Sequence, residues 1–583
     1  MTTTPPVQVD PVTLEILRAN LVAITDEMKT NLRRTAYNAI IYEAQDFTVG
    51  LFDRNGDTVS IGLGLPMFVG GLSQAIKAKI EHYGYDGIEP GDILLTNDAY
   101  IMGSHLNHMI FTVPIFADGE IVAFASSMAH WLDVGGVLGG TTQDIYSEGL
   151  QVPIVKIFKR GVQDDELTRI IRTNVRFADL ALGDLRAQIA AIRTGERRLT
   201  ELIERYGADV VTHGFELIYE RGEALARHAV EAIPDGEYVA ETTMDDDGVT
   251  LGKPVPIKVR VVIEGDLMTI DLSGVSPQVA GYFNSGATAG RSAAQVAFKF
   301  LTSPHEYPVN EGSLRPVRIV LPPGLVVSAT KPAAMRWWMT YPMTIIDCVF
   351  RALAQAVPGG TIAGHHADLA VLNLYGTDPA SGRLFLYNGG AQGGGWGATA
   401  AKDGENATIC INDGDTHNTP VEVSEAKYPS LLVERYALRP DSGGPGRHRG
   451  GLGTVYEIRT DTPVRLNTFM ERTRSAPWGI DGGGDALPNR ISLLTADGEP
   501  IAFRNGKVDS RPVGAGDRIV VETGGGGGYG PPHERPVDDV VRDVRAGYVT
   551  AEAAREHYGV ALAGPLDGDL IVDEATTTRL RTR

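Results

Sequence analysis

The sequence predicts a multi-domain α+β protein that is rich in antiparallel sheet and carries a helical segment in its N-terminal half. The chain has 583 residues, which is enough for about three or four domains of ordinary size. Its 69 glycines indicate many tight turns and close backbone approaches. Short apolar runs bounded by Asp and Gly dominate from residue 236 onward, whereas residues 165–233 repeat apolar side chains at helical spacing.

Changes in the spacing of the apolar residues divide the chain into four predicted domains. Residues 1–235 are expected to form an α+β domain with long helices, and 236–356 a β-rich middle domain. A glycine-rich β domain is expected over 357–530, and a helical tail over 531–583. The pentaglycine at 524–528 is predicted to be a flexible joint or an anion-cradling loop. It is not a P-loop, because no Gly-Lys-Ser/Thr sequence follows it.

The first elements are clearly marked in the sequence. Asp10 precedes Pro11, and apolar residues then recur at steps of three and four as far as Leu32, which predicts a capped helix. Residues 40–52 predict a strand. A turn rich in Asp, Asn and Gly then leads back into a second strand over 58–63, so these two strands are expected to pair as a hairpin.

Later elements follow from the same reasoning. A short helix is expected over 72–82 and a strand over 93–96, and residues 165–233 are expected to form two or three long helices. The remaining predictions are strands at 238–244, 255–262, 267–272 and 317–321, and helices at 288–303 and 538–558.

Charge and cysteine content exclude several partners and sites. The formal net charge of -20 lacks the basic footprint that nucleic acid or an anionic membrane surface requires. The two cysteines, Cys348 and Cys410, form no CxxC pair, so neither a disulfide framework nor a thiolate zinc site is expected. A signal peptide and a run of about 18 apolar residues are both absent, which predicts a cytoplasmic protein with no membrane association.

A predicted hairpin with histidines at its mouth organises the N-terminal half. Residues 109–117 and 120–129 are rich in Val, Ile and Phe, and Asp118-Gly119 between them is a common signal for a two-residue type I′ turn. The arms end in Ser104-His105-Leu106-Asn107-His108 and in His130-Trp131-Leu132-Asp133. The sequence therefore places several metal-ligand side chains near one end of a single hairpin.

The two-residue turn also predicts the register of the two arms. His130 is expected opposite Asn107, and Ala129 opposite His108. Strict alternation would then put His105 and His130 on one face and His108 on the other. All three histidines can join only if the chain bulges or turns near Asn107.

These residue types suit a metal site. Opposed Cβ atoms in an antiparallel pair are about 5 Å apart, so the three histidines and Asp133 can converge. Imidazole and carboxylate without thiolate suit Zn, Mn or Fe(II). Asp46 or Asp98 could complete the ligand set, and Asp133 is either a ligand or the group that orients His130. The alternative is a set of polar side chains that satisfy backbone groups at the hairpin mouth.

Two weaker clusters are also present. One is the segment 365–368, His-His-Ala-Asp, whose adjacent histidines would point to opposite faces of a strand. The other is His417 with Asp413 and Asp415. Arg336, Trp337 and Trp338 are further candidates to line a substrate pocket, although packing is the ordinary role of tryptophan.

Several motifs in order along the chain resemble the hydantoinase B family. The motifs are Asn97-Asp98-Ala99-Tyr100, Gly103-Ser104-His105-Leu106-Asn107-His108, Ala129-His130-Trp131-Leu132-Asp133-Val134-Gly135-Gly136, Asn310-Glu311-Gly312-Ser313, Asp441-Ser442-Gly443-Gly444 and Gly525-Gly526-Gly527-Gly528-Tyr529-Gly530. That family includes B subunits of ATP-dependent N-methylhydantoinases, lactamases and oxoprolinases, and related subunits of acetone and acetophenone carboxylases.

The resemblance implies a division of labour between subunits. A partner, the A subunit, has an actin-like ATPase fold, binds the ATP and phosphorylates the substrate, which is a cyclic amide or a ketone. This chain is then the B subunit, whose divalent metal, Zn or Mn, serves the hydrolysis of a hydantoin, lactam or oxoproline ring. The expected assembly is a heterotetramer or larger. The alternatives are a subunit of a ketone carboxylase and a non-catalytic scaffold for the ATPase subunit.

The resemblance also sharpens the expected site. It supports His108 as a ligand position and adds Asp46, so the expected metal ligands are Asp46, His105, His108 and His130. Glu43 or Asp133 is the expected catalytic carboxylate that takes a proton. In the family the position of His108 is usually aspartate, and imidazole in its place favours Zn over Mn.

Overall fold

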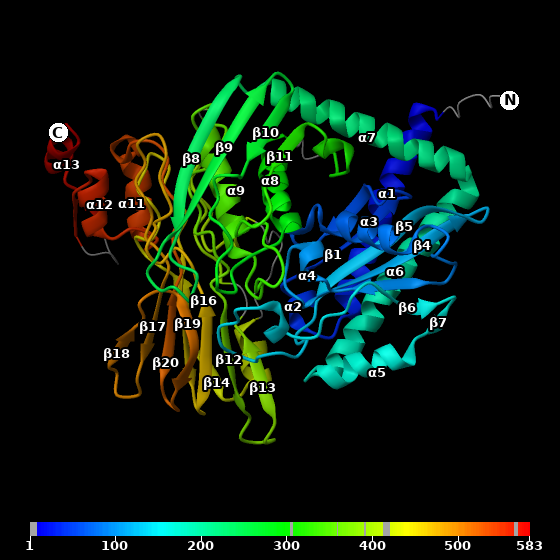
Figure 1. Ribbon diagram of the computed structural model, residues 1–583. Helices are drawn as coiled ribbons and strands as arrows, with labels where there is room; N and C mark the ends of the chain where they lie inside the picture. Colours follow the sequence, from blue (N-terminus) through cyan, green and yellow to red (C-terminus); the bar gives the residue numbers. More distant parts are fainter. Residues whose placement is uncertain are drawn as a thin grey trace.

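The computed structural model (Figure 1) describes residues 9–302, 307–357, 359–389, 392–411, 420–564 and 570–582. Several antiparallel sheets alternate with groups of helices, so the predicted α+β class is confirmed. No helix in these ranges is both long and apolar enough to cross a membrane.

The N-terminal sheet has the strand order β2-β1-β5-β4-β3-β6-β7. Its strands are β1 (Phe47–Asp53), β2 (Thr58–Leu63), β3 (Ile93–Thr96), β4 (His108–Ala117), β5 (Glu120–His130), β6 (Val155–Lys159) and β7 (Val162–Gln163). Both faces are buried. Met109 and Phe111 of β4 pack in a cluster with α1 (Pro11–Thr35) and α6 (Ala178–Tyr206), whereas Ile110 belongs to a second cluster on the opposite face.

The long helices of this half follow the predictions, whereas the one-turn helices Ala39–Tyr42 and Ala99–Met102 were not predicted. Asp10 caps α1 by accepting from the backbone of Val12 and Thr13, as expected. The predicted strand over 40–52 is wrong in its first half, because Asn38 caps a one-turn helix, α2 (Ala39–Tyr42), before β1 begins. The others are α3 (Gly71–Tyr83), α4 (Ala99–Met102), α5 (Asp165–Asn174) and α7 (Ala208–Glu231), which runs across the molecule toward β8 in Figure 1.

A four-stranded sheet of order β11-β10-β9-β8 makes up the middle of the chain. It consists of β8 (Gly236–Met244), β9 (Val255–Glu264), β10 (Leu267–Asp271) and β11 (Val317–Val320), with helices α8 (Ala287–Thr302) and α9 (Thr340–Leu353) beside it. The sequence reading missed α9, which is buried on almost every side. One hydrophobic cluster joins this sheet to the N-terminal sheet across the predicted boundary at 235, and the four domain ranges stay a prediction.

The C-terminal half holds two further sheets, of order β13-β12-β16-β19 and β14-β15-β20-β17-β18. Their strands are β12 (Leu372–Thr377), β13 (Leu384–Asn388), β14 (Leu431–Leu438), β15 (Thr454–Thr460), β16 (Val464–Phe469), β17 (Arg490–Leu494), β18 (Pro500–Ala502), β19 (Lys507–Val513) and β20 (Arg518–Glu522), with α10 (Val421–Lys427) before β14. Figure 1 shows both sheets on the side of the molecule away from α6.

Four glycine-rich segments pack together beside these sheets, and we call them the glycine core: residues 393–397, 443–453, 479–484 and 524–528. The pentaglycine is buried within it. Each of its five amides donates to a protein acceptor, such as the Gly451 carbonyl for Gly526 at 2.9 Å and the Gly364 carbonyl for Gly527 at 2.7 Å. The prediction of a flexible joint or an anion-cradling loop is therefore wrong, because no amide is left to bind an anion.

The chain ends in a small helical unit with its own apolar cluster. It contains α11 (Val537–Arg545), α12 (Ala551–Tyr558), β21 (Leu562–Ala563), β22 (Ile571–Val572) and α13 (Glu574–Arg581). The single helix predicted over 538–558 is thus two helices. They are separated by a turn in which Gly547 adopts a positive φ of 71°.

Candidate metal centre

The turn of the central hairpin forms as predicted, but the register of its arms does not. Asp118 and Gly119 adopt positive φ values of 51° and 87°, as a type I′ turn requires. Pairing then shifts by one residue next to the turn, because Ile115 lies opposite Ala123 and Val122 is left as the extra residue of a bulge.

The bulge places His108 directly opposite His130. Directly opposed residues of an antiparallel pair share one face of the sheet, so both imidazoles project to the same side. The predicted register, which paired His130 with Asn107, is therefore wrong by one residue. The prediction that His108 and His130 lie on opposite faces is wrong for the same reason. His105 reaches the same volume from the loop after α4, where Gly103 adopts a positive φ of 78°.

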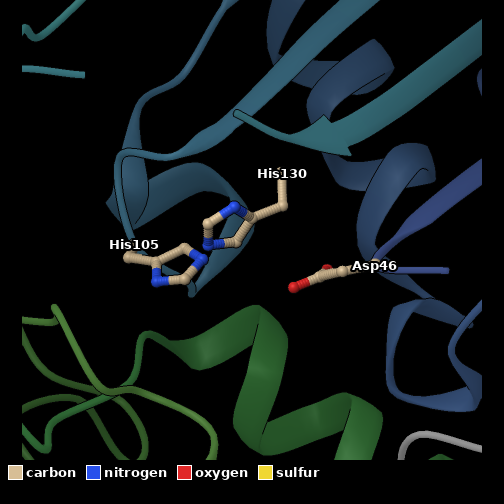
Figure 2. Close-up of side chains that lie close together, drawn as sticks. All are labelled: Asp46, His105 and His130. Atoms are coloured by element: carbon tan, nitrogen blue, oxygen red, sulfur yellow. The ribbon is translucent and has the colours of Figure 1, made fainter. Parts of the chain in front are cut away.

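Four of the predicted residues come together at this point. One ligand atom each of Asp46, His105 and His130 lies within 4.8 Å of the others, and Figure 2 shows these side chains pointing toward one another. His108 joins them, since its Nε2 lies 3.0 Å from Asp46 Oδ1 and 3.3 Å from His105 Nε2. Asp46 is held there by the chain between α2 and β1, and its carbonyl accepts from the His130 amide at 3.0 Å.

Backbone and hydroxyl partners orient the rings. His105 Nδ1 lies 3.0 Å from the Arg336 carbonyl, to which it donates, so His105 Nε2 carries a lone pair. His108 Nδ1 lies 2.8 Å from Ser104 Oγ, and His130 Nδ1 is buried without a hydrogen-bond partner. The centre thus collects electron-rich atoms, which a proton on His108 or a cation between the groups would satisfy.

Burial controls the charge of these groups. It lowers the pKa of His108 to about 3 and lowers the pKa values of His105 and His130 well below their usual range. It also raises the pKa of Asp46 to about 6, against the opposing influence of His130. At neutral pH the three imidazoles are therefore neutral and Asp46 is ionised, which is the protonation state that metal ligands need.

Two cavities meet at His105 and His130. The first, which we call the apolar cavity, is walled mainly by Ile40, Leu65, Met67, Trp338, Leu369 and Val371. The second, the polar cavity, is bordered by Asn107, Asp133, Glu148, Arg336, Asn373 and Asn388. A ligand at the centre would thus have an apolar wall on one side and hydrogen-bonding groups on the other.

The remaining predicted carboxylates lie outside the cluster of four. Asp133 borders the polar cavity and is paired with Arg176 at 2.6 Å. Glu43 lines a neighbouring hollow beside Tyr37 and Tyr42, and it lines neither of the two cavities. Their roles as proton acceptors stay predictions. Asp98 instead caps α4 by accepting from the Tyr100 amide.

Glu148 is a buried residue of this site that the sequence reading missed. Its carboxylate accepts from the amides of Met335 and Arg336 at 3.0 and 2.8 Å and from the Thr142 hydroxyl at 2.7 Å. It thereby fixes the peptide segment whose carbonyl holds His105. Burial raises its pKa to about 7. No local pattern marks Glu148, because its partners lie 187 and 188 residues away in the chain.

The weaker histidine clusters do not form a comparable centre in the described ranges. His365 and His366 are buried, and His365 Nδ1 lies 3.3 Å from Asp347 Oδ1. Among the described residues, Asp46, His105 and His130 alone bring three potential ligand atoms within 4.8 Å of one another. His417, Asp413 and Asp415 lie outside the described residues.

The fold and the site define a class: a multi-domain α+β protein with a buried histidine–carboxylate centre at the mouth of an antiparallel hairpin. The sequence model of the family described as "Hydantoinase B/oxoprolinase" matches residues 10–532. The chain belongs to this family, and the resemblance seen in its motifs is confirmed.

Relatives and solved structures agree with this assignment. The chain is 33% identical over 593 residues to the caprolactamase subunit beta of Pseudomonas jessenii, with 98% of each chain covered. The crystal structure of the ATP-dependent caprolactamase from Pseudomonas jessenii superimposes with a TM-score of 0.91 at 30% identity, covering 99% of this chain and 100% of that one. A nucleotide-free acetone carboxylase structure superimposes with a TM-score of 0.89, covering 98% of this chain and 82% of that one. Because the sequence identity is 20%, this similarity supports the fold alone.

Proposed function

We propose that this chain is the metal-binding B subunit of an ATP-dependent cyclic-amide hydrolase. It opens a hydantoin, lactam or oxoproline ring after an actin-like A subunit has phosphorylated the substrate, and ATP binds to that partner. The kinship with a caprolactamase subunit supports the amide class. The assembly is proposed to be a heterotetramer or larger.

The observation that carries the proposal is the convergence of Asp46, His105, His108 and His130 in a buried volume. No Lys or Arg side chain is among the described residues of this cluster. A single proton could join His108 to Asp46, but it would leave the lone pair of His105 and the ring of His130 without a partner. A divalent cation satisfies all of these donors together, and Zn or Mn suits an imidazole and carboxylate set.

The groups of the chain then have distinct tasks. When bound, a divalent metal supplies Lewis acidity, which polarises a substrate oxygen and makes water more acidic. The Arg336 carbonyl and Ser104 keep the rings of His105 and His108 aligned. Water adds to the activated carbonyl carbon and loses a proton, the ring carbon–nitrogen bond breaks as the nitrogen takes up a proton, and hydrolysis of the resulting acyl phosphate releases phosphate. Asp133 borders the polar cavity, so it is the better placed of the two predicted proton acceptors.

Metal analysis of two double variants tests the site. We expect His105→Ala with His130→Ala to lose stoichiometric Zn or Mn while its far-UV spectrum stays native. The matched control is His82→Ala with His228→Ala, which removes two exposed imidazoles and should keep the metal. Full metal occupancy in the first variant would exclude this site.

Turnover with the A subunit tests the reaction. We expect ATP hydrolysis coupled to ring opening with hydantoins or lactams, independent of bicarbonate. Turnover of a ketone that requires bicarbonate would instead assign the chain to a ketone carboxylase. Full activity of the complex with a metal-free B subunit would leave the chain as a scaffold for the ATPase subunit.

A further inference from the structure

We propose that the apolar cavity selects a cyclic amide whose ring carries no charged substituent. The inference rests on the proposed function and narrows its substrate class. Among the ring types considered under the proposed function, a neutral lactam or hydantoin fits the apolar cavity. Oxoproline, a lactam that bears a carboxylate, does not.

The walls of the cavity come from four separate stretches of the chain. Apart from the partly exposed Ile40, the wall residues are almost fully buried, with Met67 1% exposed, Trp338 2%, Leu65 5%, and Leu369 and Val371 6% each. Among the described residues, no lysine or arginine lines this cavity. Its charged or ionisable groups are Asp46, His105 and His130, which belong to the metal centre itself.

The polar cavity does not supply the missing cation. Arg336 is the cationic side chain among its described lining residues, and its guanidinium donates to the carbonyls of Leu138 and Gly140 at 2.9 and 3.3 Å. Glu148 borders the same cavity and acts electrostatically on Arg336. Asp133 is paired with Arg176 at 2.6 Å, so the charged side chains at this cavity already have partners within the protein. On the polar side, a carboxylate on the ring would therefore compete with the phosphate of the activated substrate, and on the apolar side it would be buried unpaired.

The amide itself decides how the ring is oriented. Its polar carbonyl and nitrogen belong at His105 and His130, where the two cavities meet, and the ring carbons then extend along the apolar wall. In oxoproline the carboxylate is attached to such a ring carbon. An ionised carboxylate without a partner is strongly disfavoured in a site of this kind.

Three matched ligands test this selectivity on the isolated, metal-loaded chain. Pyrrolidinone is the bare five-membered lactam, oxoproline adds a carboxylate, and oxoprolinamide has the size of oxoproline without its charge. We expect pyrrolidinone and oxoprolinamide to bind and oxoproline to bind at least about tenfold more weakly than oxoprolinamide by calorimetry or ligand-observed NMR. Equal or tighter binding of oxoproline would overturn the inference, as would the absence of binding by both neutral lactams.

A pair of wall variants adds a second readout. Leu369→Arg brings a cation to the apolar wall and should reverse the preference toward oxoproline, whereas the control Leu369→Met should keep the preference for the neutral ligands. If Leu369→Arg does not fold, the comparison of the three ligands on the unaltered chain still decides the question.

The binding experiment separates this inference from the proposed function. It requires neither ATP nor the A subunit nor turnover. A chain that selects neutral lactams but opens no ring with its partner would refute the function and keep the cavity assignment. A complex that opens neutral and carboxylated lactams equally well would support the function and refute the cavity assignment.

Discussion

At the mouth of the β4–β5 hairpin, side chains from two strands and two loops converge, whereas in the glycine core the backbone itself is the packing surface. A Cβ atom added at Gly526 would lie 1.9 Å from the Trp396 carbonyl oxygen, and one at Gly450 1.7 Å from the Gly526 carbonyl oxygen. At the hairpin mouth, by contrast, side chains meet at ordinary contact distances. His108 Nε2 lies 3.0 Å from Asp46 Oδ1 and 3.3 Å from His105 Nε2.

The two regions are therefore expected to tolerate different kinds of substitution. The candidate metal centre depends on the identity and orientation of a few side chains, while the strands that carry them are held by other packing. The glycine core depends on the absence of side chains, and almost any replacement must move backbone. We therefore expect substitutions at the centre to change metal binding and substitutions in the glycine core to change folding.

The largest effect is expected for Gly526→Ala. The added methyl group meets the backbone of Trp396, which cannot move away as a flexible side chain could. We expect a loss of more than about 4 kcal/mol of unfolding free energy, or no soluble protein, measured by urea denaturation. The control is Gly119→Ala in the hairpin turn, where no atom lies within 4 Å of the new Cβ and only the φ of +87° is unfavourable. It should cost about 1–2 kcal/mol, and equal losses in the two variants would abolish the contrast.

The next effect is expected for Glu148→Ala, which tests whether the centre depends on remote backbone support. Removing the carboxylate frees the amides of Met335 and Arg336 and loosens the carbonyl that orients His105. Metal affinity should fall about 10- to 100-fold in a chelator competition. Glu148→Gln keeps an acceptor oxygen and should lose less. An unchanged affinity in Glu148→Ala would show that His105 needs no such support.

The pH dependence of metal binding should follow Asp46. Its pKa of about 6 means that a proton occupies the carboxylate below that pH and must leave before metal binds. Apparent affinity should therefore be nearly constant from about pH 6.5 to 8 and fall about tenfold per pH unit below 6. In the metal-free chain, folding stability should change with pH in the opposite direction to metal affinity. The raised pKa of Asp46 stabilises the folded state at low pH, and this contribution is lost as pH rises through about 6. A midpoint near 4 in metal titrations would contradict this assignment.

The smallest effect is expected for His108→Asp, which introduces the aspartate that the family resemblance implies for this position. A carboxylate in place of imidazole makes the centre harder and more negative, so preference should shift from Zn toward Mn by a factor of about three to ten. Competition between the two ions, followed by metal analysis, measures the shift. The fold should be unaffected, since His108 is one side chain in a hairpin that other contacts secure.

The sequence predicted the hairpin and its turn because Asp118 and Gly119 are a local signal. It placed the arms one residue out of register because nothing local marks Val122 as a bulge. Pairing of β5 with β1 and β4 on either side selects that register, and neighbouring strands are not visible in a pattern of alternation.

Other misses have similar physical causes. The turn of helix at α2 was read as strand because its residues are apolar, although Asn38 is a good N-cap. Glu148 acts on backbone that is remote in the chain, so neither composition nor spacing identifies it. The pentaglycine was read as flexible because glycine is permissive, yet here the same lack of a side chain lets four backbone segments meet.

The hydrophobic cluster shared by the N-terminal and middle sheets limits how the molecule can be divided. Ile110 and Phe124 lie in one cluster with Val261 of β9 and Ile346 of α9. A fragment cut at residue 235 would expose the first pair to water as a broad apolar face, and such faces promote aggregation. Studies of the candidate metal centre therefore call for the whole chain, even though every proposed ligand lies within its first 130 residues.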